Sequence, residues 1–411
     1  MRTKPVLRTV VLLALAWMLT WNVSTFAATA SGTVTVWVGS WWEPQIPIAT
    51  QMWAQDYPGV TLKIEPLPIN GYLDKFVASA LGGTPPDVID LDATWVSTAA
   101  AKGLLQPLDA LTKSLDVKDY SPSVWASSRY NGHQYAIPNR ASANVFYYNK
   151  TVFDKAGAAY PTDTWTFGDM LQIARKVTTA GQYGVGVAAD LSDPSNAMDL
   201  LSAVIWAYGG DFLNKDSTKA TINSPKSVQA LTFWADLYTK YHVAPEGTPN
   251  FTTTRDLLPL FEANKVGMIT GSSNIFDELS KHKDLRWGVV LSPSKVNRSG
   301  GWTMGVPVGA QNAAAAQVFL LWLAKPANMG KIMNRTPARL SVYNAPPWND
   351  PKYVIFAKAL RDARSLPTVG NWASIQTVII TDAQKILVGQ MTPQQAADAM
   401  ATQIDALLAK K

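Results

Sequence analysis

Beyond residue 30 the chain opens with alternating hydrophobic and polar positions, which predict a β-strand. Val34, Val36 and Val38 alternate with threonine and tryptophan, the period-two pattern of a half-buried strand. Helical and strand patterns then alternate: a helix over 47–57, a strand over 60–65, a helix over 70–81, a strand over 87–91 and a helix ending at Gly103. This alternation predicts an α/β fold in which helices flank a mostly parallel sheet.

The second half of the chain repeats the alternation. Three helix starts are marked by capping residues, at Thr166-x-x-Asp169, Ser224-Pro225 and Thr392-Pro393-x-Gln395. Strands are predicted over 183–188, 266–270 and 287–291. Because ligands of such sheets bind beyond the carboxyl ends of the strands, the loops after Val38 and Leu91 are the first places to look for a site.

The N-terminus has the pattern of a secretory signal peptide, over residues 1–30. Arg2, Lys4 and Arg8 form a basic start, an apolar run covers 10–19, and Ala28-Thr29-Ala30 is a small-residue cleavage site. A membrane anchor is the alternative, but it needs about 20 apolar residues. The protein is therefore expected to be secreted.

Length and composition narrow the class of protein. The chain has 411 residues, 47% of them hydrophobic and 16% charged, which favours two compact domains. The chain has 36 basic and 30 acidic residues. Removal of the signal leaves 33 basic residues against 30 acidic ones, a net charge of +3, and no Lys/Arg run predicts nucleic-acid binding.

The absence of cysteine excludes disulfides, thiolate metal sites and a lipid anchor, and favours a periplasmic protein. The three histidines have no metal-ligand spacing, so no metal is expected.

Tryptophan is the unusual residue. Of 16 tryptophans, two belong to the signal; Trp41, Trp42, Trp95, Trp302 and Trp372 follow strand ends or glycines. An aromatic ring covers the apolar face of a pyranose, and carboxylates, amides and guanidinium groups bind its hydroxyls. The polar neighbours are Glu43, Asp92, Thr94, Asn139, Arg140 and Asp211.

Core packing is the alternative interpretation for these five tryptophans. It is the better interpretation for the tryptophans inside predicted helices and strands, which are Trp37, Trp53, Trp234, Trp287 and Trp322. Trp206 stays open, and Asp92 is equally well a helix cap.

Several segments, in order, resemble the extracellular solute-binding proteins of ABC sugar importers, the family typified by maltose-binding protein. They are Val34-Thr35-Val36-Trp37, Tyr57-Pro58-Gly59-Val60, 84–88 through 103–108, Tyr135-Ala136-Ile137-Pro138, Tyr147-Tyr148-Asn149-Lys150, Gly209-Gly210-Asp211, Lys265-Val266-Gly267-Met268 and Gly301-Trp302. The resemblance covers nearly all of the chain after the signal.

The resemblance implies a two-lobed periplasmic-binding-protein fold with the sugar in the cleft. One lobe would comprise 31–142 and 301–340, and the other 143–300 and 341–411. It implies these ligand-binding residues: Trp41, Trp42, Glu43, Asp92, Thr94, Trp95, Arg140, Asn144, Asp211, Ser273, Asn274, Trp302 and Trp372. Trp41-Trp42 replace charged residues of the typical maltose binder, and Ser273 replaces an aromatic one, so maltose is not carried over as the ligand.

The predicted function is capture of a sugar, a di- or oligosaccharide, outside the cytoplasmic membrane and its delivery by hinge closure. The implied partners are the permease subunits of an ABC transporter, with the binding protein itself a monomer, and neither a cofactor nor a catalytic residue is expected. The alternatives are a secreted glycosidase or lyase, which needs two carboxylates at one bond, a binding protein for another solute, and a purely structural secreted protein.

Overall fold

The computed structural model describes residues 32–410, so the predicted signal peptide lies outside the described residues. The chain divides into two compact units. The first unit comprises Met1–Asp90 and Val306–Leu320, and the second comprises Leu91–Gly305 and Leu321–Lys411. The predicted lobe limits near 142, 300 and 340 do not coincide with this division and stay a prediction.

The first unit is built on parallel strands. β1 (Gly32–Gly39) pairs in parallel with β2 (Val60–Leu67) on one side and with β3 (Val88–Asp92) on the other. The valines predicted to face inward, Val34, Val36 and Val38, are fully buried. Further elements of this unit are η1 (Ser40–Gln45), α3 (Ile46–Asp56), α4 (Tyr72–Leu81) and the first part of α14 (Ala313–Leu323). The parallel arrangement predicted for this half is confirmed.

A long antiparallel pair runs through the second unit. β6 (Ala136–Ala143) pairs with β11 (Asn297–Gly305), and the short β12 (Ala363–Arg364) pairs in parallel with the start of β11. The β6–β11 register shifts between Trp302 and Thr303, which is a β-bulge. Segment 336–338 adds backbone hydrogen bonds to the other edge of β6, because Thr336 accepts from Ala141 and Ala338 donates to Asn139.

A second, mixed sheet follows in the order β10 (Trp287–Leu291), β7 (Val145–Asn149), β9 (Val266–Gly271) and β8 (Tyr183–Val185). β7 is antiparallel to both of its neighbours, and only β8 and β9 are parallel. The expectation of a mostly parallel sheet is wrong for this part of the chain. β7 follows β6 after the single residue Asn144, so the chain passes directly from one sheet into the other.

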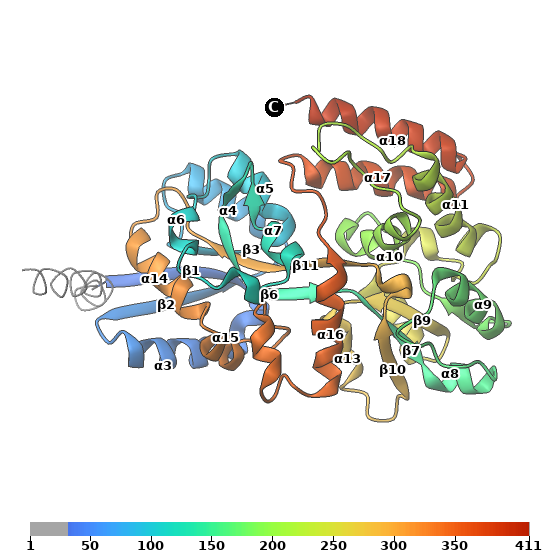
Figure 1. The fold of residues 1–411 in the computed structure, drawn as a ribbon, viewed down its shortest axis with the longest axis horizontal. Coiled ribbons are helices and arrows are strands. Elements are labelled where there is room, and N and C mark those ends of the chain that lie inside the picture. The colour runs from blue at the N-terminus through green and yellow to red at the C-terminus, as the bar shows by residue number, and fades with distance from the viewer. Residues whose placement is uncertain (1–31, 411) are drawn as a thin grey trace, which may run out of the picture. The chain divides into compact units, whose positions relative to one another are not determined.

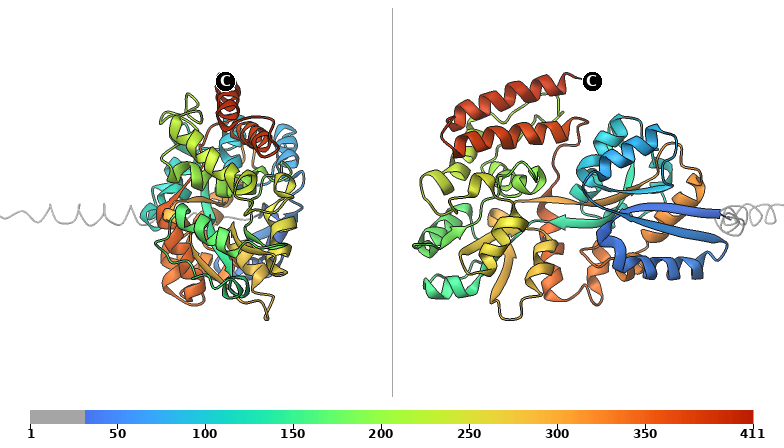
Figure 2. Two further views of the ribbon diagram at one scale, coloured as in Figure 1. Left: turned by 90° about the vertical axis from the view of Figure 1, so that its right-hand side faces the viewer. Right: turned by 180° about the vertical axis from the view of Figure 1, so that it is seen from behind.

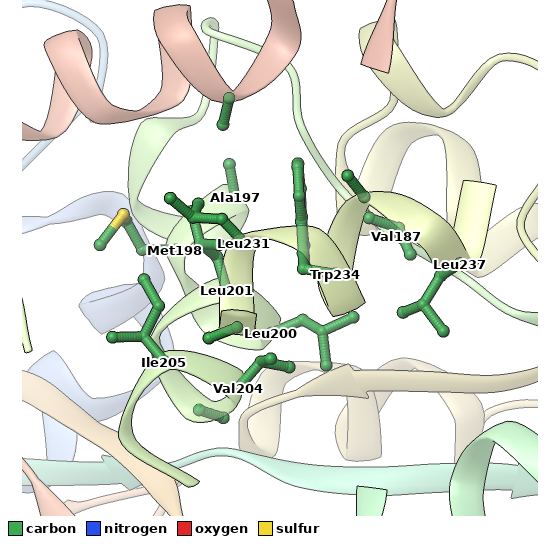
Figure 3. Packing of buried hydrophobic residues seen from close by; sticks show 14 of the residues in the cluster. Val187, Ala197, Met198, Leu200, Leu201, Val204, Ile205, Leu231, Trp234 and Leu237 are labelled. Atoms are coloured by element: carbon green, nitrogen blue, oxygen red, sulfur yellow. The ribbon is translucent and has the colours of Figure 1, made fainter. Parts of the chain in front are cut away.

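Helices supply most of the core of the second unit. The longest are α10 (Pro194–Ala207), α11 (Pro225–Thr239), α17 (Trp372–Leu387) and α18 (Pro393–Leu408). Figure 1 and Figure 2 show α17 and α18 side by side. Leu201, Val204, Leu231 and Trp234 belong to one buried hydrophobic cluster at α10 and α11 (Figure 3). Large apolar side chains on facing helices therefore fix this core.

The remaining elements of the second unit are short. They are α5 (Ala93–Ala101), α6 (Asp109–Thr112), η2 (Val117–Asp119), α7 (Pro122–Ala126), β4 (Arg129–Tyr130), β5 (His133–Gln134), α8 (Lys150–Lys155), α9 (Phe167–Val177), η3 (Thr248–Asn250), η4 (Thr253–Leu257), α12 (Leu258–Glu262), α13 (Ser273–Leu279), η5 (Pro293–Lys295), α15 (Pro326–Ile332), η6 (Leu340–Asn344) and α16 (Pro351–Asp362). The capping boxes predicted from Thr166 and Thr392 are both formed, so local sequence sets these two helix starts.

Candidate functional site

Two predicted tryptophans of the second unit meet edge to face. The rings of Trp95 and Trp302 lie 5.7 Å apart at an interplanar angle of 81°, a favourable aromatic geometry. Trp95 stands in the first turn of α5, and both side chains are half-buried. Half-burial leaves part of each ring accessible, which is what a stacking platform for a sugar needs.

α5 is positioned by the residue that precedes it. Asp92 Oδ1 accepts hydrogen bonds from the backbone N–H of Thr94 at 2.9 Å and from its hydroxyl at 2.6 Å. Asp92 is thus the N-cap of α5. The cap occupies Oδ1 and the Thr94 hydroxyl, so these two predicted site residues hold Trp95 in place.

Trp302 lies inside β11 rather than beyond its end, so its predicted place after a strand is wrong. Gly301, immediately before it, has φ +138°, and a Cβ there would come 2.1 Å from the Arg140 carbonyl oxygen. Only glycine fits this close approach of β6 and β11. The bulge that follows is formed by Asn139 of β6, which has no register partner between Trp302 and Thr303.

A charged cluster adjoins this aromatic pair. The Arg140 guanidinium lies 5.9 Å from the Trp302 ring centroid, within cation–π range. Arg335 Nε lies 2.8 Å from Asp277 Oδ2, and both side chains are about a quarter exposed. Burial raises the pKa of Asp277, while the positive charges of Arg335 and Arg140 oppose that rise. Two guanidinium groups therefore act on one carboxylate.

Sequence reasoning missed Arg335, Asp277 and Thr336. Ser273, which was predicted, is buried, and its hydroxyl lies 3.1 Å from that of Thr336. Asn274 Oδ1 accepts from the Ser272 hydroxyl at 2.7 Å. Segment 335–336 has no helix or strand pattern of its own, so no periodicity marked it. Only its pairing with β6 places it beside Arg140.

The predicted residues of the first unit have mixed surroundings. Trp42 is 2% exposed, and its Nε1 donates to Asp90 Oδ2 at 3.1 Å. Trp41 is half-buried, and its ring lies where a side chain at Gly39 would stand. Glu43 is exposed. All three belong to η1, so the turn after β1 presents Trp41 and Glu43 and anchors Trp42.

Asn144 links the two sheets of the second unit. It is 4% exposed, its backbone N–H donates to the Arg298 carbonyl at 3.1 Å, and its carbonyl accepts from the Ser292 hydroxyl at 3.0 Å. Arg298 and Asp199 form a buried ion pair nearby, with Nε and Oδ1 3.2 Å apart. Burial raises the pKa of Asp199 to about 6 despite the opposing charge of Arg298. These residues stabilise the start of β11.

Asp211 lines a cavity of about 700 Å³, and no other predicted site residue is part of its lining. Its Oδ1 accepts from Trp206 Nε1 at 3.1 Å and from the Phe212 N–H at 2.9 Å, and its Oδ2 lies 2.6 Å from Arg364 Nη2. The Arg364 guanidinium lies 4.7 Å from the Trp206 ring centroid. The sequence left open whether Trp206 packs in the core or contacts a ligand. Its side chain is 5% exposed and lies beneath this ion pair.

Trp372 is the predicted site residue with the least access to a ligand. It begins α17, has no exposed surface, and packs 5.9 Å from Phe212 in the main core of the second unit. In residues 32–410 no group of three His, Asp or Glu side chains could hold a metal ion. Within the same residues, no helix has the length and apolarity to cross a bilayer.

Comparison with known proteins defines the class. The family described as bacterial extracellular solute-binding protein matches residues 41–330, and the chain belongs to it. Its fold is that of the two-lobed periplasmic binding proteins. A solute-binding protein from Thermotoga lettingae, solved with α-D-tagatose, is 25% identical, with a TM-score of 0.80 over 92% of this chain and 100% of that one.

Two curated relatives extend the comparison. The mannitol-binding protein of Pseudomonas aeruginosa is 24% identical over 72% of this chain and 69% of its own. The maltotriose-binding protein of Pyrococcus abyssi is 24% identical over 86% of this chain and 78% of its own. This chain is therefore similar to binding proteins for ring sugars and for an open-chain polyol.

Proposed function

We propose that this chain captures a ring-form sugar, a di- or oligosaccharide, in the periplasm and delivers it by hinge closure to the permease subunits of an ABC transporter. The observation that carries the proposal is the half-buried pair of Trp95 and Trp302 beside Arg140. Membership of the solute-binding family and relatives that bind tagatose and maltotriose support it.

The chemistry of this group suits an uncharged sugar. Trp302 offers an aromatic face to the C–H surface of a pyranose. Arg140 donates to ring hydroxyls, and Asp277 accepts from them. Because Asp277 balances part of the charge of Arg140 and Arg335, a neutral ligand meets both donors and acceptors. Trp41 and Glu43 in η1 are further proposed contacts. Trp372 and Asn144 are left out because both are buried.

The proposal includes no turnover of the sugar. A glycosidase would need two carboxylates about 5–10 Å apart that face one glycosidic bond. The Asp277 carboxylate of this group is held by Arg335 at 2.8 Å. We infer binding followed by release of the intact sugar.

The test is thermal melting of the chain without residues 1–30 against ring sugars, with glycerol 3-phosphate and a dipeptide as representatives of other solutes. A ligand at about 100 times its Kd should stabilise the protein by about 2.7 kcal/mol. Stabilisation by one class of sugar, with the sugar recovered intact by chromatography, supports the proposal. Stabilisation only by glycerol 3-phosphate or the dipeptide contradicts it, and a hydrolysed sugar contradicts the absence of turnover.

Site residues are tested by calorimetric titration with the sugar identified in that way. Trp302→Ala should weaken binding at least tenfold, or about 1.4 kcal/mol. Trp125→Ala is the matched control, because Trp125 is also half-buried but contacts Tyr120 at 5.1 Å instead of Arg140. Equal losses in both variants would show that Trp302 is not a contact of the sugar.

A further inference from the structure

We propose that the cavity beside Asp211 and Arg364 is a second ligand site, specific for an open-chain polyol and independent of the ring-sugar site. The cavity has a volume of about 700 Å³, within the range of small-molecule sites. Its walls come from the segment after α10, the N-terminal side of α11 and the segment that joins β12 to α17. All of them belong to the second unit.

The ion pair at the wall of this cavity is built to bind a vicinal diol. Asp211 Oδ1 accepts from two N–H donors, whereas Oδ2 accepts only from Arg364 within residues 32–410. The side chains of Asp211 and Arg364 are 39% and 47% exposed. A carboxylate oxygen and a guanidinium N–H therefore stand side by side in reach of a ligand. One hydroxyl of a diol donates to Asp211 while its neighbour accepts from Arg364.

The geometry of the pair is fixed before a ligand arrives. The backbone carbonyl of Asp211 accepts from the Thr221 hydroxyl at 3.1 Å and from the Ser227 hydroxyl at 3.2 Å. A Cβ at Gly210 would lie 2.5 Å from the Ser227 hydroxyl oxygen, so the chain packs closely at this point. A pre-positioned pair loses little conformational entropy when a ligand binds.

The rest of the lining explains why the ligand is a polyol rather than a ring sugar. Five residues of the lining carry a hydroxyl group: Ser217, Thr221, Ser224, Ser365 and Thr368. No aromatic side chain of the described residues lines the cavity. The indole of Trp206, which contacts the ion pair, is covered by Arg364. A pyranose would find no platform for its apolar face, whereas an open-chain polyol carries a hydroxyl on every carbon.

The charges of the lining favour a neutral ligand. Asp211 and Arg364 neutralise each other at 2.6 Å, and the remaining charged side chain of the lining is Lys215, which is exposed. A phosphate group is bound by several converging donors or unpaired guanidinium groups. One exposed lysine does not meet this requirement, so polyol phosphates should bind no better than polyols.

The first experiment is calorimetric titration of the chain without residues 1–30 with mannitol and with ribitol, alone and in the presence of a saturating ring sugar. The proposal expects polyol binding that the ring sugar leaves unchanged. Competition between the two ligands would overturn the second site while it leaves the proposed sugar capture intact. Absence of polyol binding at millimolar concentration, or tighter binding of glycerol 3-phosphate, would also overturn it. If no ring sugar binds at all, the polyol titration still decides this proposal.

Variants locate the polyol. Arg364→Gln and Asp211→Asn should each weaken polyol binding about tenfold or more and leave the ring-sugar affinity within about twofold. Arg361→Gln is the matched control, because Arg361 is an exposed arginine near the end of α16 that has no ion pair within the described residues. Unchanged polyol binding in Arg364→Gln would overturn the proposal.

A local signal guards against an indirect effect of these variants. Fluorine NMR of the chain labelled with fluorinated tryptophan, with Trp206 assigned through Trp206→Phe, reports on the ring under Arg364. Mannitol should shift the Trp206 resonance and leave that of Trp302 in place. A shift of Trp302 alone would place the polyol in the ring-sugar site and overturn the proposal.

Discussion

The second unit contains the same two kinds of group twice, once buried and once accessible. In the core, Trp372 has no exposed surface and Arg298 pairs with Asp199 at side-chain exposures of 10% and 4%. Outside the core, the Trp302 side chain is only partly buried, and Arg364 pairs with Asp211 at side-chain exposures of 47% and 39%. The chemistry is alike, so burial separates the groups that support the fold from those that we propose to meet a ligand.

The two arginines make this comparison unusually direct. Arg298 and Arg364 are register partners in the β11–β12 pair. Arg298 reaches Ser195 and Asp199 in α10, and Arg364 reaches Trp206 in the same helix and Asp211 just after it. Two adjacent strands thus each contribute one arginine to α10, one in a dry environment and one at a cavity.

The largest expected effect is on the buried tryptophan. Trp372→Ala should lower the free energy of unfolding by about 4 kcal/mol, because it opens a cavity in the main core. Urea unfolding measures this loss. Trp302→Ala should cost only about 1–2 kcal/mol, since its ring is already partly exposed. Equal losses would remove the distinction between the two tryptophans.

The buried arginine comes next. Arg298→Ala should destabilise the protein by about 3 kcal/mol, since it leaves the buried Asp199 carboxylate without its counter-charge. Arg298→Met, which fills a similar volume, should not restore stability at neutral pH, because the charge is still missing. Full stability of the methionine variant in urea unfolding would show that packing rather than charge is the function of Arg298.

Asp199 should give the protein a measurable pH dependence. Its folded pKa is raised from 3.8 to about 6, so the folded state binds its proton more tightly than the unfolded state does. The contribution of Asp199 is fully present below about pH 4 and is lost as pH rises through about 6, by about 2–3 kcal/mol. Asp199→Asn should remove this slope, as measured by urea unfolding at several pH values. Parallel curves for the two proteins would contradict the shift.

The smallest effect is expected at the accessible pair. Arg364→Ala should change the free energy of unfolding by about 0–1 kcal/mol, as is usual for solvent-exposed ion pairs. The measurement is again urea unfolding, in low and high salt. A loss as large as that of Arg298→Ala would mean that Arg364 is a structural residue, and the cavity beside it would lose its interpretation as a binding site.

Local patterns predicted much of the fold because local interactions decide it. The period-two pattern of β1 and the capping boxes at Thr166 and Thr392 appear as predicted. The antiparallel direction of β7 could not be predicted in this way, because its partners β9 and β10 lie far along the chain and leave no local signal in the sequence of β7.

The site was harder to predict than the fold. Tryptophans after glycines pointed to Trp302 but also to Trp372, because a sequence does not show which side of a helix or strand faces the core. The predicted residue Asp92 is a helix cap, as the sequence already allowed. Arg335 and Arg364 were missed, since each acquires its role from a partner over 50 residues away, Asp277 or Asp211.

The bulge between Trp302 and Thr303 has a consequence for strand length. Opposite Trp302 and Thr303 the partners are Arg140 and Pro138, so the extra residue is Asn139 in β6. Side chains alternate between the two faces of a strand, and this one residue therefore reverses the parity of β6 between Arg140 and Pro138. Insertion or deletion of a further residue beside Asn139 would shift the pairing and turn side chains such as that of the buried Ile137 to the opposite face. Substitutions are tolerable on much of this strand pair, whereas a change of length is not, and any chimera made with a relative should carry 137–140 and 302–304 together.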